Sequence, residues 1–138
     1  EIDSYPEKSF IKMKIPKIRF IEKNFEERLL KARCLILDHP GTTFDIAIAA
    51  NIPTLLFWSK GSWLFTNEGE IILKKLEKAK IYHPDGRSAA DFLNSIAFDE
   101  DIWWNSKEVQ KAKTMYQKKY AMISKNWRDD WVKIIKKL

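Results

Sequence analysis

Two short apolar runs of strand length, with one helix between them, constrain this chain more than any other feature. Residues 34–37 (CLIL) and 54–58 (TLLFW) carry no charge, and the Ala/Ile-rich residues between them end at Asn51, shortly before Pro53. Uninterrupted apolar strands are typical of a parallel sheet whose faces are both covered. Parallel neighbours require a helical crossover. The pattern therefore predicts an α/β fold.

The same alternation continues on both sides of this unit. Paired capping residues predict helices that begin at Asn24, Asn67 and Ser88, with acidic partners three residues later. The further elements expected are a strand at residues 17–21, helices at 24–30, 67–79 and 88–97, and a strand at 80–83, with an irregular start over 1–16. We therefore expect one Rossmann-like, three-layer domain over residues 1–138, with a mainly parallel sheet.

The C-terminal region, residues 106–138, has the period of a basic amphipathic helix. Apolar side chains recur in steps of three and four from Val109 to Leu138, which predicts one long helix or two stacked helices broken near residues 124–126. Residues 101–138 hold 10 Lys and Arg against 4 Asp and Glu, so they carry the whole net charge of +6. Such a region serves either as a solvated face or as an electrostatic contact with an anionic membrane.

Two tryptophans of this region, Trp127 and Trp131, are four residues apart and therefore share one helix face. We expect them to pack inward against the α/β layer or a partner. The lysines expected on the opposite, exposed side are Lys125, Lys133, Lys136 and Lys137.

Several classes of protein are excluded by what the chain contains. Its 138 residues suit a single core, and its longest uncharged apolar run is too short for a bilayer span. The lone Cys34 excludes an internal disulfide and a cysteine zinc site, which favours the reducing cytoplasm. We find no metal-ligand spacing and no nucleic-acid module, so neither a metal nor nucleic acid is expected. The start without Met or a leader suggests a piece of a longer protein.

The loops that follow the two apolar strands are the candidate sites, because ligands of open parallel sheets bind beyond the strands' carboxyl ends. In the first loop, Gly41, Thr42 and Thr43 open a helix whose free N–H groups suit a phosphate. The alternative is that Thr42 caps the helix with Asp45 as its partner. His83, after a later strand, is interpreted as a turn residue rather than a ligand.

The second loop places a cation and two indoles near the same edge. Lys60 suits a phosphate, while Trp58 and Trp63 suit stacking on a base or sugar, with Ser59 beside them. The alternative is a surface loop whose tryptophans pack on the domain.

These stretches resemble a known class of enzymes. LDHPGTTFD at residues 37–45 and AANIPTLLFW at 49–58 resemble the nucleotide-binding half of GT-B glycosyltransferases. Together with IYH at 81–83, SAA at 88–90, WWNSKEVQ at 103–110 and SKNW at 124–127, they resemble more closely a bacterial transferase family of O-antigen and surface-polysaccharide clusters. The spacing from Asp38 to Asp45 is also similar to CDP-glycerol glycerophosphotransferases.

The resemblance spans residues 17–138 and implies the C-terminal half of a GT-B enzyme that binds a nucleotide-sugar donor as substrate, without a further cofactor. It implies that the donor base or sugar lies near Asp38, His39 and Asp45. In the sugar transferases the ribose-binding acid stands where this chain has Ile46, so Asp45 either contacts the ribose or caps the helix.

The resemblance also implies that the acceptor site and general base lie on an N-terminal domain, so this piece alone is expected to bind but not to turn over. No catalytic residue is assigned in this chain. We expect a cytoplasmic protein, peripheral at the membrane's inner face where the basic region contacts lipid. The alternative is a non-catalytic interaction module that works through its basic, aromatic C-terminal helix.

Overall fold

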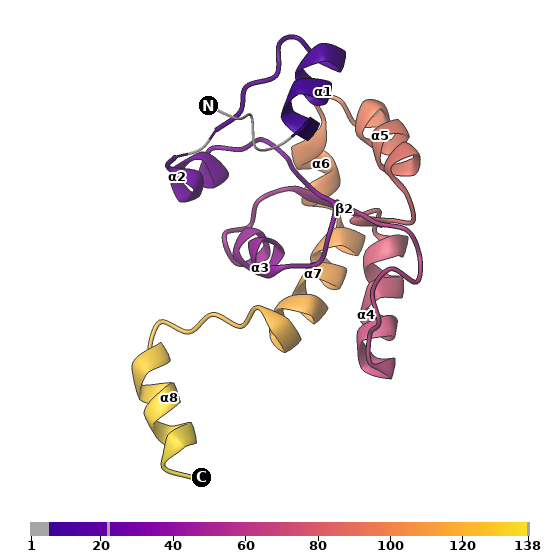
Figure 1. The fold of residues 1–138 in the computed structure, drawn as a ribbon. Coiled ribbons are helices and arrows are strands. Elements are labelled where there is room, and N and C mark those ends of the chain that lie inside the picture. The colour runs from indigo at the N-terminus through magenta and orange to yellow at the C-terminus, as the bar shows by residue number, and fades with distance from the viewer. Residues whose placement is uncertain (1–5, 22, 138) are drawn as a thin grey trace.

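A three-stranded parallel sheet forms the centre of the computed structural model, which describes residues 6–21 and 23–137 (Figure 1). Its strands are β1 (Leu35–Leu37), β2 (Thr54–Phe57) and β3 (Tyr82–His83), and they lie side by side in chain order. Both pairings are parallel. The predicted α/β class and parallel sheet are confirmed.

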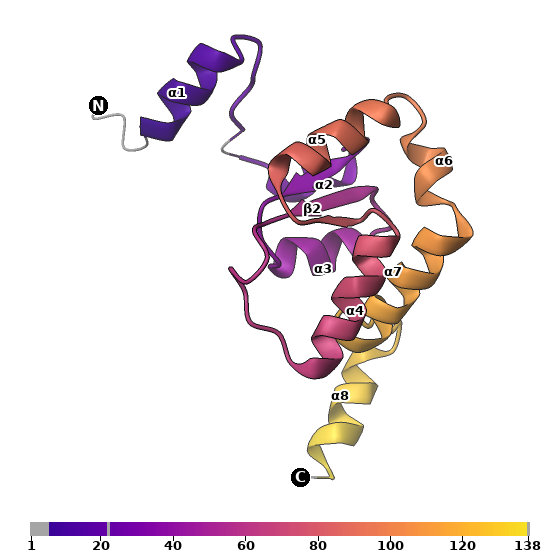
Figure 2. The same ribbon diagram turned by 90° about the vertical axis from the view of Figure 1, so that its right-hand side faces the viewer.

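Helices cover both faces of the sheet, as Figure 2 shows. In the described ranges they are α1 (Pro6–Lys14), α2 (Phe25–Leu30), α3 (Thr42–Ala49), α4 (Asn67–Lys78), α5 (Gly86–Ser95), α6 (Glu100–Trp104), α7 (Lys107–Tyr120) and α8 (Trp127–Ile135). α5 packs on one face against β2 and β3, whereas α3 and α4 lie on the other, where α7 packs against both. The connections β1–α3–β2 and β2–α4–β3 cross over with the same hand, and the strands follow one another across the sheet in chain order. The helices α3 and α4 therefore lie on the same face.

The main core lies between the sheet and the layer of α3, α4 and α7. Phe44, Leu56, Ile72, Tyr82 and Val109 belong to its cluster of buried side chains. These residues come from every element of the layer, so burial of their apolar surface holds the helices to the sheet. A smaller cluster of Leu29, Ala47 and Ile52 attaches α2.

Two helices end in the same way and lead directly into a strand. Asn51 after α3 and Lys80 after α4 have left-handed backbones, with φ of 58° and 60°. At α3, the Asn51 N–H donates to the Ile48 carbonyl and the Ile52 N–H to the Ala47 carbonyl. This pattern is the Schellman motif, and α4 ends with the equivalent pair of bonds. The helix stop expected at Asn51 is therefore confirmed.

The first strand differs from its prediction. A run without charge predicted burial on both faces, but β1 is an edge strand of this sheet, and Ile36 is 48% exposed. The expected strand at residues 17–21 is also wrong within the described residues, which have no strand there. Those residues connect α1 to α2 away from the sheet (Figure 2). Alternating polar and apolar residues suit a strand, but a strand also needs a neighbouring strand to pair with, and the alternation does not provide one.

Helix starts were predicted less well than helix ends. The expected irregular start over 1–16 contains α1, and Asn24 precedes α2 without a side-chain capping bond. Thr66 caps α4 by accepting from the Gly69 N–H at 3.2 Å, and Asp85 caps α5 by accepting from the Ser88 N–H at 2.8 Å. These caps stand one and three residues before the predicted ones.

The C-terminal region was expected to form either one long helix or two stacked helices. It forms two helices, but they are not stacked. α7 packs in the core layer, and α8 extends away from the body in both views (Figures 1 and 2). Trp127 and Trp131 are 56% and 59% exposed, so their expected packing against the α/β layer is wrong. The apolar period continues from α7 into α8, but residues 121–126 between them are not helical and turn the chain outward. α6 was not predicted.

Candidate functional site

A pocket of about 360 Å³ opens beside the carboxyl ends of β1 and β2. Its walls are mainly apolar and come from five places: the loops after β1 and β2, and helices α3, α4 and α7. The lining residues include Pro40, Phe44, Trp58, Trp63, Leu64, Phe65, Gly69, Ile72, Tyr116 and Tyr120. This is the sheet edge where open parallel sheets bind ligands, and aromatic walls suit a planar or ring-shaped group.

The N-terminus of α3 adjoins this pocket. Gly41 is its N-cap, with an extended backbone and no side-chain capping bond. Residues 41–43 lie between two residues of the pocket wall, Pro40 and Phe44. The first N–H groups of α3 are therefore not satisfied by a side-chain cap, which is the condition for anion binding at a helix start. The alternative in which Thr42 caps with Asp45 is wrong, because Thr42 is already helical.

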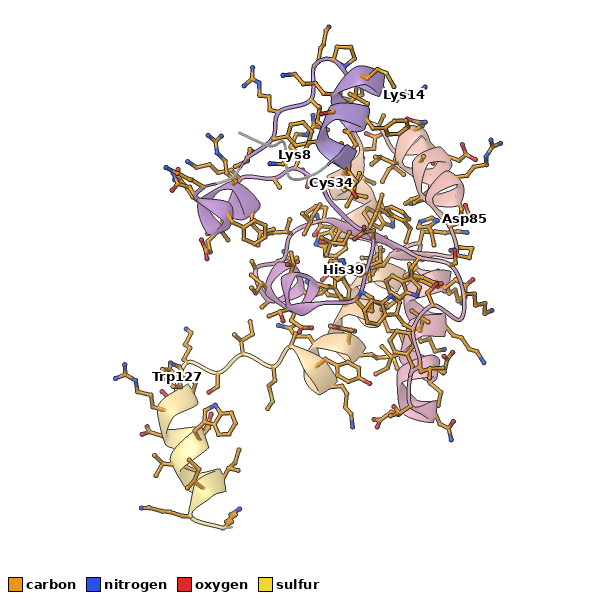
Figure 3. All side chains as sticks on the ribbon, viewed as in Figure 1. Lys8, Lys14, Cys34, His39, Asp85 and Trp127 are labelled. Atoms are coloured by element: carbon orange, nitrogen blue, oxygen red, sulfur yellow. The ribbon has the colours of Figure 1, made fainter. Side chains whose placement is uncertain are left out.

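Asp38 and His39 form a pair at the start of the same loop. The His39 Nδ1 lies 2.7 Å from the Asp38 Oδ1, and both side chains are exposed. A carboxylate only accepts, so His39 donates from Nδ1, and in the neutral ring Nε2 is then an acceptor. A Cβ at Gly41 would lie 3.1 Å from the His39 ring, so glycine leaves room for the imidazole beside the α3 N-terminus (Figure 3).

The loop after β2 contains one buried and one exposed tryptophan. Trp58 is buried, with its ring 4.5 Å from that of Tyr82, so the interpretation that it packs on the domain is confirmed for this residue. Trp63 lines the pocket and is 45% exposed, which leaves it accessible to a ligand. Between them, the Ser62 N–H donates to the Ser59 carbonyl and closes a turn with Lys60 exposed at its tip.

The carboxylate of Asp45 is engaged within the domain. The Tyr116 hydroxyl donates to Asp45 Oδ1 at 2.7 Å, and the Tyr116 ring packs on Phe44 at 4.6 Å. Burial, and then the Asp45 carboxylate, raise the pKa of Tyr116. Tyr116 and Tyr120 were missed as site residues because their four-residue spacing was interpreted only as an apolar stripe. They line the pocket on α7.

The ring of His83, at the end of β3, is buried and makes two hydrogen bonds within the domain. It is 2% exposed, its Nε2 lies 3.0 Å from the Lys80 carbonyl and its Nδ1 lies 2.9 Å from the Ser88 hydroxyl. The carbonyl only accepts, so Nε2 donates to it and Nδ1 accepts from Ser88 in the neutral ring. Burial lowers the pKa of His83, which favours this neutral form. These contacts anchor the β3–α5 connection.

The structure brings the candidate residues of the two loops to one edge of the sheet but divides their roles. Trp58 and Trp63 are the candidates that line the pocket. The remainder are not lining residues and lie on the two loops and the start of α3: Asp38, His39, Gly41, Thr42, Thr43, Asp45, Ser59 and Lys60. Within the described residues there is no group of three or more acidic, His or Cys side chains that could hold a metal ion.

The helices of the described residues are all too short or too polar to span a bilayer. A family model described as LIC12162 family transferase matches residues 3–135. No curated protein and no solved structure matches the chain. The family match covers nearly the whole chain, including the sheet, both loops and the pocket. The chain therefore belongs to the LIC12162 family of transferases.

Proposed function

We propose that this chain binds the nucleotide-sugar donor of a glycosyltransferase-like enzyme of surface-polysaccharide, O-antigen, biosynthesis, and that it is the donor-binding half of a GT-B fold. The observation that supports this most is an aromatic pocket beside a helix N-terminus without a side-chain cap, at the carboxyl edge of a parallel sheet. A nucleoside diphosphate has the matching chemistry, since its ring systems are planar and its phosphates are anionic.

The diphosphate is assigned to the start of α3. The amides of Gly41, Thr42 and Thr43 and the two threonine hydroxyls supply uncharged donors there, and the helix dipole favours negative charge. The exposed Lys60 supplies a cation from the neighbouring loop. Such donors neutralise the charge that develops on the diphosphate as the sugar leaves. His39, oriented by Asp38, lies close enough to take part.

The base or sugar is assigned to the pocket, against Trp63. Tyr120 on α7 lines the pocket as well and is exposed. Asp45 already accepts the Tyr116 hydroxyl, so its role in this proposal is to hold the pocket wall and not to contact the ribose. We place the acceptor and the general base on another domain of the enzyme, and the enzyme in the cytoplasm, peripheral at the inner face of the membrane.

Titration calorimetry with UDP, CDP and GDP tests this proposal. We expect binding of at least one nucleotide, weakened by Thr43→Ala through the phosphate and by Trp63→Ala through stacking. Thr114→Ala is the matched control, since Thr114 is an exposed threonine on α7 whose hydroxyl donates to the Gln110 carbonyl. Absence of binding at millimolar nucleotide, with Thr43→Ala indistinguishable from the parent, contradicts the proposal.

A second candidate function, a non-catalytic interaction module, is favoured by a different observation. α8 holds no buried residue and exposes its aromatic side chains. In that function the sheet is a scaffold and α8 is the working surface. The nucleotide titration discriminates between the two functions, because a scaffold has no reason to bind any of the three nucleotides.

A further inference from the structure

α8 presents an apolar stripe that the other described residues, within 6–21 and 23–137, leave exposed. None of its residues is buried, and it projects from the body in both ribbon views. Figure 3 shows Trp127 at its start, on the projecting helix. Trp131 and Ile134 follow at spacings of four and three, so the three side chains lie along one face, with Ile135 beside them.

The segment that leads to the helix also exposes apolar side chains. Met122 and Ile123, in the non-helical connection from α7, are 80% and 63% exposed. Exposed apolar side chains therefore occur both before the helix and on it, with Ser124, Lys125 and Asn126 between the two groups. Single exposed apolar residues need no explanation, but a row of large apolar side chains along one helix face marks an interaction site.

The charge around the stripe is predominantly positive. Residues 125–137 carry five cationic side chains against two carboxylates: Lys125, Arg128, Lys133, Lys136 and Lys137 against Asp129 and Asp130. One of the carboxylates is internally engaged, since Asp130 accepts from the Ser124 hydroxyl and pairs with Lys133 at 3.5 Å. The Arg128 guanidinium lies 5.2 Å from the centre of the Trp127 ring, at the edge of the stripe.

We propose that α8 lies in the surface of an anionic lipid bilayer, with Trp127, Trp131 and Ile134 inserted at the boundary between headgroups and acyl chains. Tryptophan prefers this boundary because its ring is amphipathic. Short helices with an apolar stripe and a cationic polar face bind anionic lipid through both features. Arg128, beside the stripe, reaches back to the phosphates while its stem stays in the apolar layer.

Charge complementarity selects lipid over a second copy of the chain. Two α8 helices that met through their stripes would bring two sets of these cations together, whereas anionic headgroups attract them. The proposal names α8 as the element that makes the peripheral membrane contact. Because α8 does not depend on the nucleotide site, the vesicle experiment can fail while the nucleotide experiment succeeds, and the reverse.

Binding to vesicles tests the assignment. We expect the chain to co-sediment with vesicles of equal parts phosphatidylcholine and phosphatidylglycerol at low salt, and not with phosphatidylcholine alone. Replacing Lys133 and Lys136 by Glu reverses two charges and is expected to weaken binding by about thirtyfold or more. Salt that shortens the Debye length to about 3 Å is expected to weaken it as well.

The inserted side chains are tested by the double variant Trp127→Ala/Trp131→Ala. We expect it to lose about tenfold or more in vesicle binding. It should also lose the part of the tryptophan fluorescence that brominated lipid quenches in the parent. Neither side chain is buried, so the variant should fold as the parent does. The matched control is Ile71→Ala/Ile102→Ala, which removes two exposed apolar side chains from α4 and α6.

Three outcomes overturn the proposal. The first is absence of parent binding to the anionic vesicles at low salt. The second is equal vesicle binding by the tryptophan variant and the isoleucine control. The third is a concentration-dependent dimer that the tryptophan variant abolishes while vesicles bind neither protein, which would assign the stripe to a second copy of the chain.

Discussion

The Tyr116 hydroxyl on α7 donates a 2.7 Å hydrogen bond to the Asp45 carboxylate on α3, across 71 residues of sequence. Both elements form walls of the aromatic pocket, and Phe44 beside Asp45 packs against the Tyr116 ring. The bond therefore sets the distance between two walls that belong to different parts of the chain. It also gives the Asp45 carboxylate a partner within the domain.

Loss of this bond should destabilise the domain measurably. We expect Tyr116→Phe to lower the free energy of unfolding by about 1.5–3 kcal/mol, because the acceptor is a carboxylate. Urea unfolding measures the change. Tyr120→Phe is the matched control, since Tyr120 lies one turn further along α7 and is exposed. Equal stability of the two variants would show that the bond contributes nothing.

The parts of the fold that depend on local sequence signals were predictable. The strands β1 and β2 carry uninterrupted apolar runs, and the end of α3 carries Asn51 followed closely by Pro53, so both were found close to their observed bounds. The carboxyl edge of the sheet followed from the parallel pairing that a helical crossover implies. This was enough to place the loops that adjoin the pocket.

The parts that depend on distant partners were not predictable. The edge position of β1, the contact of Tyr116 with Asp45 and the outward course of α8 are set by tertiary packing. A period of 3.6 shows that one helix face is apolar but does not show what covers that face. Tyr116 and Trp131 belong to the same apolar series in the sequence, yet one lines the pocket and the other is exposed.

The tryptophans should therefore differ sharply in their effect on stability. Trp104 is 2% exposed and packs in the main core, so we expect Trp104→Ala to cost about 3–5 kcal/mol. Trp127→Ala and Trp131→Ala should each change the free energy of unfolding by less than about 0.5 kcal/mol. Thermal or urea unfolding of the three variants tests this order. A large loss at Trp131 would mean that α8 docks on the domain.

Substitution of Asn51 should destabilise the domain more than substitution of an exposed asparagine normally does. Its Oδ1 accepts from the Trp104 Nε1 at 3.1 Å and from the Lys113 Nζ at 2.5 Å, and its φ is positive. We expect Asn51→Ala to cost about 2–4 kcal/mol, from lost hydrogen bonds and left-handed strain. Asn51→Gly should cost about 1 kcal/mol less, because glycine adopts this φ freely.

Lys80 supplies the control for the backbone part of this effect. It has the same left-handed conformation after α4. Lys80→Gly should leave the stability unchanged or raise it by up to about 1 kcal/mol. Urea unfolding compares the three variants. If Asn51→Ala and Asn51→Gly were equally stable, backbone strain would not contribute.

Lower pH should destabilise the domain through His83. Burial lowers the pKa of His83 below its ordinary 6.5 in the folded chain. Above about pH 7 the ring is neutral in both states, so its contribution to stability is complete. As the pH falls below 6.5, the unfolded chain gains a proton that the folded chain does not bind, and stability is lost until the pH reaches the lowered pKa.

A variant that lacks the His83 ring isolates this effect. His83→Gln should be less stable than the parent at pH 8 but should lose less stability between about pH 7 and pH 5, because the protonation difference is gone. Thr114→Ala is the control, since Thr114 is exposed and carries no titratable group, and it should keep the parent's pH dependence. Urea midpoints measured across this range test the prediction. Parallel pH profiles for the parent and His83→Gln would show that the buried ring is not the titrating group.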